Sequence, residues 1–323
     1  MHVYRWDLDR TYLDTDIRSM RGMVRAALEP ATAKGHVPGA PTLLRTLLDH
    51  DPRAQATLLS GSPTQLRGVL EERLALDGVR FESLMLKDNL RNIRKGRLRA
   101  LRGQVGYKLP QLLTMRLSRP RGVTETLFGD DAEVDALIYA TYADVIAGRV
   151  TPDALQDLME SAGAYPDQIH AALKAQARLP QEDAVEAIYI HADRHLPLHL
   201  FRTLGPQVHV VASWWQAALG LVDAQRLAPA DAIAVARACS EAGGLDAIEI
   251  AALAQDAVRR GVCTPQALLS CLDAPGVEPA IATPCRQALR ILGDTPKAHA
   301  APSERNFLAF LDAVRGWEAR NRE

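Results

Sequence analysis

Short apolar runs with β-strand character alternate with segments of helical periodicity along the first two thirds of the chain. These runs are rich in Val, Ile, Leu and aromatic residues, which is typical of buried strands. Strands that alternate with helices predict an α/β protein with a Rossmann-like, mostly parallel sheet covered on both faces. The predicted strands are VYRW (3–6), QATLLS (55–60), VRFESLML (79–86), VTETLFG (123–129), VEAIYIH (185–191) and QVHVVAS (207–213).

Helical periodicity fills the intervals between these strands. A helix is expected after the first strand, through about residue 30, and LLRTLLD (43–49) has the pattern of another. The same periodicity returns in PTQLRGVLEERLAL (63–76) and in KLPQLLTMRL (108–117).

Two longer helical stretches depart from this alternation. Residues 146–184 contain helix starts such as TPDAL, and we interpret them as a helical insertion between two sheet strands. From residue 214 onward no strand pattern returns, and the alanine-rich helical segments end with an amphipathic helix at 306–320. We therefore predict one domain over 1–213, which carries the insertion, and a helical C-terminal region over 214–323.

The bulk composition describes an ordinary soluble chain. Its 323 residues can bury a large core, and a content of 47% hydrophobic and 24% charged residues is typical of globular proteins. A net charge of −1 provides no electrostatic footprint for nucleic acid, so no such partner is expected. No apolar run approaches the ~20 residues of a membrane helix, and no signal peptide is visible, so a cytoplasmic location is expected. The cysteines lack zinc-ligand spacing and are expected to lie reduced in the helical core: Cys239, Cys263, Cys271 and Cys285.

Polar residues of a few chemical types follow the predicted strands directly. In an open α/β sheet, ligands bind beyond the carboxyl ends of the strands, so these residues are the candidates for a site. An aspartate there can attack phosphorus, and a second carboxyl two residues away can act as acid and base. Clustered carboxylates would hold Mg²⁺, and the metal would offset their mutual repulsion. The candidates are Asp7 and Asp9, Ser60, Asp130 and Asp131, together with Lys108 in the helix before the fourth strand.

The order of these residues resembles the haloacid dehalogenase superfamily of aspartate-nucleophile phosphatases. Within it, the chain is most similar to the phosphatidate phosphatase catalytic-domain family named for an actin-patch protein. DLDRTYLDTDI (7–17), LLSGSPTQL (58–66) and LFGDDAEVDALIY (127–139) carry the likeness, with IYIH (188–191) beyond them. The resemblance covers roughly residues 1–145 and 185–215.

The resemblance implies a role for each matching position. Asp7 would be the nucleophile and Asp9 the acid/base, with the Asp9 carbonyl also reaching the metal. Lys108 would pair with the phosphate and the nucleophile. The phosphoryl group would be bound by Ser60, Gly61 and Lys108, and the magnesium by Asp7, Asp9, Asp130 and Asp135, with Asp131 as a competitor for one of these places.

Several positions keep more than one interpretation. Arg10 replaces the acidic residue usual in the family motif, and Asp131 replaces a serine, so both departures bear on substrate preference. Lys87 is a rival of Lys108, because it also follows a strand. The basic run 91–103 is interpreted as a solvated helix face, with contact to anionic lipid as the alternative. The insertion at 146–184 is either a lid over the pocket or a passive elaboration.

The function expected from these features is Mg²⁺-dependent hydrolysis of a phosphate monoester through an aspartyl-phosphate at Asp7. The resemblance implies a phosphatidate-like lipid as substrate, reached by transient contact with a membrane surface. A phosphatase for soluble metabolites and a non-catalytic scaffold that binds protein partners are the alternatives, and the sequence identifies no such partner.

Overall fold

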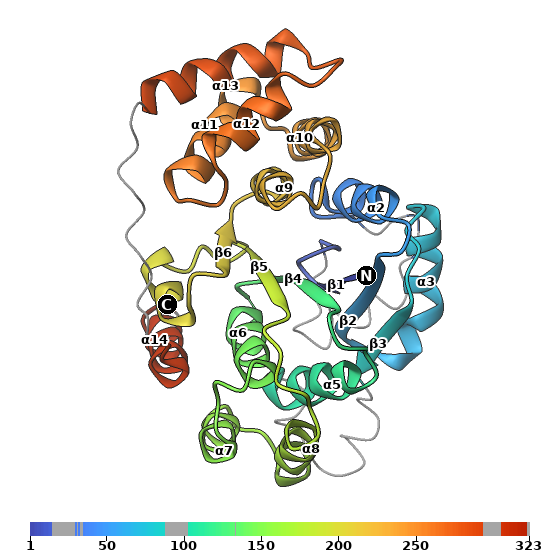
Figure 1. Cartoon of the computed structure of the whole chain (residues 1–323), viewed down its shortest axis with the longest axis vertical. Helices are drawn as coiled ribbons and strands as arrows, with labels where there is room; N and C mark the ends of the chain where they lie inside the picture. Colours follow the sequence, from blue (N-terminus) through green and yellow to red (C-terminus); the bar gives the residue numbers. More distant parts are fainter. Residues whose placement is uncertain are drawn as a thin grey trace.

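The computed structural model describes residues 1–14, 30, 32, 35–87, 103–132, 134–292 and 305–321, and its centre is a six-stranded parallel sheet (Figure 1). The strand order is β3-β2-β1-β4-β5-β6, which confirms the predicted α/β fold with a Rossmann-like sheet. The strands are β1 (His2–Asp7), β2 (Gln55–Pro63), β3 (Ser83–Lys87), β4 (Thr124–Asp130), β5 (Val185–His191) and β6 (Val208–Val211).

The third strand is shorter than its apolar pattern suggests. Helix α3 (Arg67–Leu76) ends with Gly78 in the left-handed conformation, at φ 68°. The Val79 N–H then donates to the carbonyl of Leu74 at 2.9 Å, and Val79 joins the core beside it. Val79 is therefore bonded to the end of the helix and does not start a strand. The prediction of a strand from residue 79 was wrong, and β3 begins at Ser83.

One face of the sheet is covered by α2 (Ala40–His50), α3 and α9 (Trp214–Asp223) (Figure 1). Its core is aromatic: Trp6 stacks on Phe128 with ring centroids 4.2 Å apart, and the Trp214 ring lies 5.2 Å from Trp6. The four cysteines are buried and unbridged on this side, as predicted. An outer layer completes the face, with α10 (Pro229–Gly243), α11 (Ala247–Arg259), α12 (Pro265–Leu272) and α13 (Pro279–Leu292).

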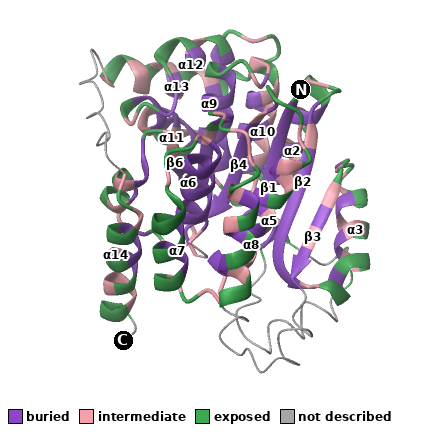
Figure 2. Ribbon diagram, turned by 60° about the horizontal axis from the view of Figure 1, so that its bottom comes forward, coloured by how far each residue is buried: buried purple, intermediate pink, exposed green. Residues whose placement is uncertain are grey.

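The opposite face is covered by α5 (Val105–Leu117) and α6 (Asp135–Ile146). Every residue of α6 is buried, because the sheet lies on one side of it and further helices on the other (Figure 2). The predicted insertion at 146–184 contains α7 (Pro152–Ser161) and α8 (Pro166–Gln176), and α8 packs against α5. The segment η4 (Leu198–Leu204) and the last helix, α14 (Phe307–Arg320), pack beside α6.

A buried group of charges lies beneath this second face. Arg5 of β1 donates to both oxygens of Glu125, at 2.5 and 2.8 Å, and neither residue is exposed. Arg116 and the Tyr142 hydroxyl also donate to Glu125, at 3.1 and 2.8 Å. Burial alone would raise the pKa of Glu125, but Arg5 and these donors outweigh it and hold that pKa at about 2.

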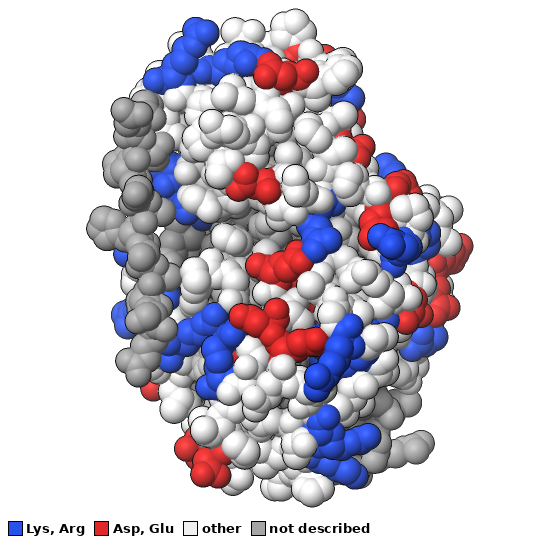
Figure 3. Space-filling model, in the orientation of Figure 1, with Lys and Arg blue, Asp and Glu red and all other residues white. Residues whose placement is uncertain are grey.

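Some predictions fall on parts of the chain that the structure leaves undescribed. They are most of the helix expected through residue 30, the motif residues Thr15 and Asp16, and nearly all of the basic run 91–103. Among the described residues, no helix has the length and apolar character needed to cross a membrane. Acidic and basic side chains are interspersed on the face of the molecule seen in Figure 3.

Candidate active site

The site lies where the strand order reverses. From β1 the chain leads to β2 and β3 on one side, whereas β4, β5 and β6 follow on the other. The connections that leave the neighbouring strands β1 and β4 therefore run in opposite directions along the sheet. In sheets of this kind, ligands usually bind in the crevice at the carboxyl ends of two such strands. Asp7 is the last residue of β1 and Asp130 is the last residue of β4. The predicted residues at these two strand ends are thus brought together.

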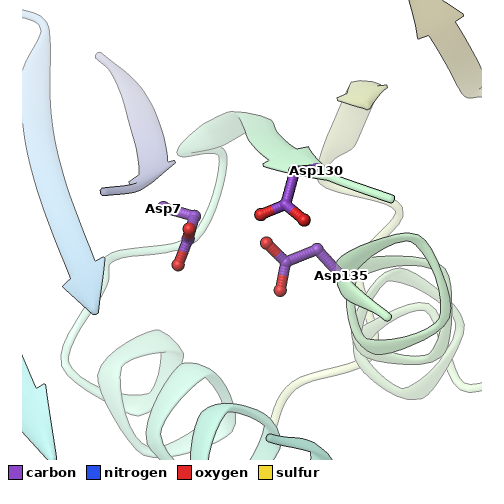
Figure 4. Close-up of side chains that lie close together, drawn as sticks. All are labelled: Asp7, Asp130 and Asp135. Atoms are coloured by element: carbon purple, nitrogen blue, oxygen red, sulfur yellow. The ribbon is translucent and has the colours of Figure 1, made fainter. Parts of the chain in front are cut away.

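Three carboxylates meet at this edge. Asp7, Asp130 and Asp135 each place one oxygen within 4.8 Å of the others, and all three residues are fully buried. Their side chains point toward one another from β1, β4 and the start of α6 (Figure 4). Asp135 enters the cluster through a turn in which Val134 adopts the left-handed conformation, at φ 60°. A β-branched residue seldom adopts this conformation, so the turn holds local strain beside the site.

Gly129 makes room for this approach. A Cβ atom added at Gly129 would lie 2.6 Å from both Cβ and Oδ2 of Asp135, which is closer than real Cβ contacts. The glycine of the GDD motif lies within β4 and is thus required by packing against a site residue.

Lys108 provides the positive charge of the cluster. Its Nζ donates to Oδ1 of Asp7 and to Oδ1 of Asp135, in each case at 2.6 Å, and it is fully buried. One ammonium among three carboxylates leaves a formal charge of −2. Lys87, the rival lysine, lies at the end of β3, where it donates to the carbonyl of Gly103 and faces the Tyr107 ring.

A second group of polar residues surrounds Asp9. The Ser60 hydroxyl donates to Oδ2 of Asp9 at 2.6 Å, and Ser62 lies 3.4 Å from the same carboxylate. The register between β2 and β3 shifts after Ser60, and this irregularity turns the SGSP segment toward Asp9. Gly61 lies against Gln104, because an added Cβ would come within 2.6 Å of the Gln104 amide nitrogen.

Two polar residues near these groups were not assigned a role from the sequence. Ser62 is the second serine of SGSP, and Thr11 is the threonine of the DxDxT motif. The Thr11 hydroxyl lies 3.4 Å from an oxygen of Asp7 and 3.3 Å from one of Asp130. The only sequence signal for a role of Thr11 was its position in the DxDxT motif.

Asp131 lies outside the three-carboxylate cluster. Its Oδ1 accepts the backbone N–H of Arg194 at 2.6 Å, and its Oδ2 accepts that of Leu196 at 2.9 Å. The structure thus brings Asp135 together with Asp7 and Asp130, and directs Asp131 toward the loop after β5.

Arg10 has an unusual backbone and a distant partner. It adopts the left-handed conformation at φ 61°, directly after Asp9, and its Nη1 donates to Oδ2 of Asp193 at 2.5 Å. Nearby, His191 stacks on Trp214 with ring centroids 5.5 Å apart, and burial lowers the pKa of His191.

A neutral side chain, Tyr139, lies buried beside the acids of the site. Burial raises the pKa of Tyr139 well above its usual value, and the charge of Asp135 raises it further. The phenol therefore stays protonated beside the acids, with its oxygen 3.4 Å from the carbonyl of Phe128. Anionic charge at the site is consequently confined to the carboxylates.

The fold and the site together define a class, an α/β protein with a buried acidic site at the switch point of a parallel Rossmann-like sheet. The family model for "Phosphatidate phosphatase APP1, catalytic domain", a haloacid dehalogenase-like family, matches residues 6–152 of the chain. The resemblance expected from the motifs is thereby confirmed, and the family implies phosphatidate phosphatase activity on a phosphorylated lipid. No match to a curated protein or to a solved structure was found.

Proposed function

We propose that this protein hydrolyses a phosphate monoester with the aid of Mg²⁺, through an aspartyl-phosphate on Asp7, and that a phosphatidate-like lipid is its substrate. The observation that carries the proposal is the position of Lys108, which bridges Asp7 and Asp135 inside the three-carboxylate cluster. This arrangement supplies a nucleophile, a fixed cation and oxygen ligands at one point of the sheet. Phosphoryl transfer depends mainly on positioning and charge neutralisation of this kind.

In the first step, an oxygen of Asp7 attacks phosphorus, and the bond from phosphorus to the leaving oxygen breaks. Asp9 gives its proton to that leaving oxygen, so the alcohol departs neutral. Water then attacks the phosphoryl group on Asp7, while Asp9 takes a proton from it, and the carboxylate of Asp7 is regenerated with release of phosphate. The short hydrogen bond from Ser60 fixes one oxygen of Asp9, which orients the other for these transfers.

The residues present fit a divalent metal ion. Three carboxylate oxygens lie within 4.8 Å of one another, and together with the Lys108 ammonium these groups carry a formal charge of −2. Hard oxygen ligands of this type are those that Mg²⁺ prefers. Asp7, Asp130 and Asp135 would hold the ion, with the Asp9 carbonyl implied as a further ligand. Its contribution when bound is to neutralise charge on the phosphoryl oxygens.

Hydrolysis of a generic aryl phosphate, measured with Mg²⁺ and with a chelator, tests the proposal. We expect wild-type turnover that requires Mg²⁺ and is absent from Asp7→Asn, which keeps the shape of the side chain but removes its nucleophilic oxygen. Asp157→Asn, at an exposed position of α7, is the matched control and should retain full activity. If the wild type shows no magnesium-dependent turnover that Asp7→Asn lacks, the proposal is wrong.

Two further measurements address the intermediate and the substrate. Acid quenching during turnover should leave one phosphoryl group on the peptide that contains Asp7, as read by mass spectrometry. Phosphatidate in mixed micelles should then be hydrolysed faster than soluble sugar phosphates. The reverse preference would favour a soluble-metabolite phosphatase with the same site.

A further inference from the structure

The loop that follows β5 reaches the groups on both sides of the site. We call residues 192–196 the β5 loop. Within it, the backbone N–H groups of Arg194 and Leu196 donate to the two oxygens of Asp131, at 2.6 and 2.9 Å. The Asp131 N–H in turn donates to the carbonyl of His191 at 3.1 Å, so the chain after β4 is bonded to the chain after β5 in both directions. Asp131 is 3% exposed, and these bonds are therefore shielded from water.

The same loop also contacts the segment that follows the first strand. Asp193 accepts from Nη1 of Arg10 at 2.5 Å, although β4 lies between β1 and β5 in the sheet. Arg10 directly follows Asp9, and Asp131 directly follows Asp130. The β5 loop thus spans the carboxyl end of β4 and is bonded next to one acid of each flanking segment.

The outer side of the β5 loop is held by the last helix. The Arg194 guanidinium donates to Oε1 of Glu318 at 2.8 Å and lies 5.3 Å from the centroid of the Trp317 ring, both in α14. Arg194 and Glu318 are 24% and 31% exposed, so the pair is only partly screened by solvent. Helix α14 itself is fixed by buried apolar residues, including Phe310, which packs on Phe201.

We propose that Asp131 and Arg194 are positioning residues of the active site, and that α14 holds the β5 loop in place through Arg194. A carboxylate whose two oxygens are both engaged by backbone N–H groups fixes the direction of the chain that carries it. Asp130 directly precedes Asp131, and its own Oδ1 accepts the N–H of Ala132 at 2.5 Å within the same turn. Groups of this outer kind commonly control metal affinity and activity through the ligands they orient. The inference rests on the proposed function for its kinetic part only.

The test compares variants of the full chain by hydrogen exchange and by kinetics. Asp131→Asn places an amide NH₂ against one backbone donor, and Arg194→Gln removes the bond to α14. In both we expect faster exchange of the amides of the β5 loop, and a fall in kcat for aryl phosphate of about tenfold or more. Arg194→Lys retains a cation near Glu318 and should recover part of the loss. Arg315→Gln, which changes an arginine of α14 that contacts Ser161 instead, is the matched control.

The two readouts separate the inference from the proposed function. Unchanged exchange in the β5 loop of both variants overturns the inference, whether or not the wild type has phosphatase activity. Faster exchange with unchanged kcat also overturns it, because the loop would then be held for stability alone. A wild type without phosphatase activity would refute the proposed function, and the exchange data would still decide whether Asp131 and α14 hold the loop. An Arg315→Gln variant as impaired as Arg194→Gln would refute the assigned path through Arg194.

Discussion

Removal of the buried ammonium from the acidic cluster should destabilise the protein strongly. Lys108→Met keeps a long, unbranched side chain of similar length but removes the charge that lies 2.6 Å from Asp7 and from Asp135. All three side chains are fully buried, so solvent does not screen the interaction that is lost. Three carboxylates then face one another with no lysine among them.

The size of the effect follows from the cost of leaving a buried charge without its partner. Breaking a buried ion pair by removal of one member typically costs about 3–5 kcal/mol of unfolding free energy. In a chain of this length each kcal/mol lowers the melting temperature by about 2–4 °C or less. Bound Mg²⁺ at a hundredfold excess over its dissociation constant would add about 2.7 kcal/mol. The loss of unfolding free energy relative to the wild type should therefore be largest in a chelator, and Mg²⁺ should restore much of it.

Urea or thermal unfolding with a chelator and with saturating Mg²⁺ measures both quantities. The control is Lys174→Met, at an exposed position of α8, which should stay within about 0.5 kcal/mol of the wild type. If Lys108→Met unfolds in a chelator as the control does, Lys108 does not hold the carboxylates together and the reasoning fails. Its kcat should also fall by about 10²–10³-fold, as expected for loss of a fixed charge at the reacting group.

Three further predictions concern buried groups of β1 and β4. Glu125→Gln leaves Arg5 buried without its counter-ion and should lower the free energy of unfolding by about 3–5 kcal/mol at pH 7. The pKa of Glu125 is about 2 in the folded protein, below its value in the unfolded chain. The difference in unfolding free energy between wild type and variant, measured in urea, should therefore shrink as the pH falls from about 4.3 toward 2. Gly129→Ala should lower kcat by forcing a site carboxylate aside, whereas Gly68→Ala, where an added Cβ has open space, should not. Burial lowers the pKa of His2 to about 4, so the unfolded chain binds more protons than the folded one between pH 6.5 and 4. The free energy of unfolding of the wild type should therefore fall by about 1.4 kcal/mol per pH unit as the pH is lowered from 6.5 to 4. His2→Gln should lack this dependence in urea unfolding.

The hydrophobic pattern was sufficient for the sheet but not for every strand boundary. The run VEAIYIH (185–191) coincides with β5, because the consecutive buried residues Ile188, Tyr189 and Ile190 point to both faces of a covered sheet. The run from residue 79 failed because Val79 serves the end of a helix, through a bond to Leu74 that apolarity does not reveal. Turn geometry competes with the strand pattern at such places, and a single Gly78 decides the outcome.

The site acids were predictable to the extent that they end strands. Asp7 and Asp130 were candidates because each directly follows a predicted strand, and ligands of open α/β sheets bind beyond the carboxyl ends of the strands. The choice between Asp131 and Asp135 could not be made from the sequence, since both follow β4 within five residues. It depends on which carboxylate meets the backbone donors of the β5 loop, and these come more than sixty residues later. The partner of Arg10, Asp193, is 183 residues away and was equally hidden.

The residues that hold the site extend beyond the part that matches the family. The match ends at residue 152, before β5 begins, whereas the β5 loop is bonded next to Asp9 and next to Asp130. Arg10 stands where the resembling motif has an acid, and this change of sign needs a counter-charge beside the site. Asp193 of the β5 loop supplies this counter-charge, so the basic residue at position 10 and the β5 loop depend on each other. In the proposed mechanism Asp9 protonates the leaving group, and Arg10 directly follows Asp9. We therefore expect the pair of Arg10 and Asp193 to be where the chain's substrate preference differs from that implied by the family motif alone.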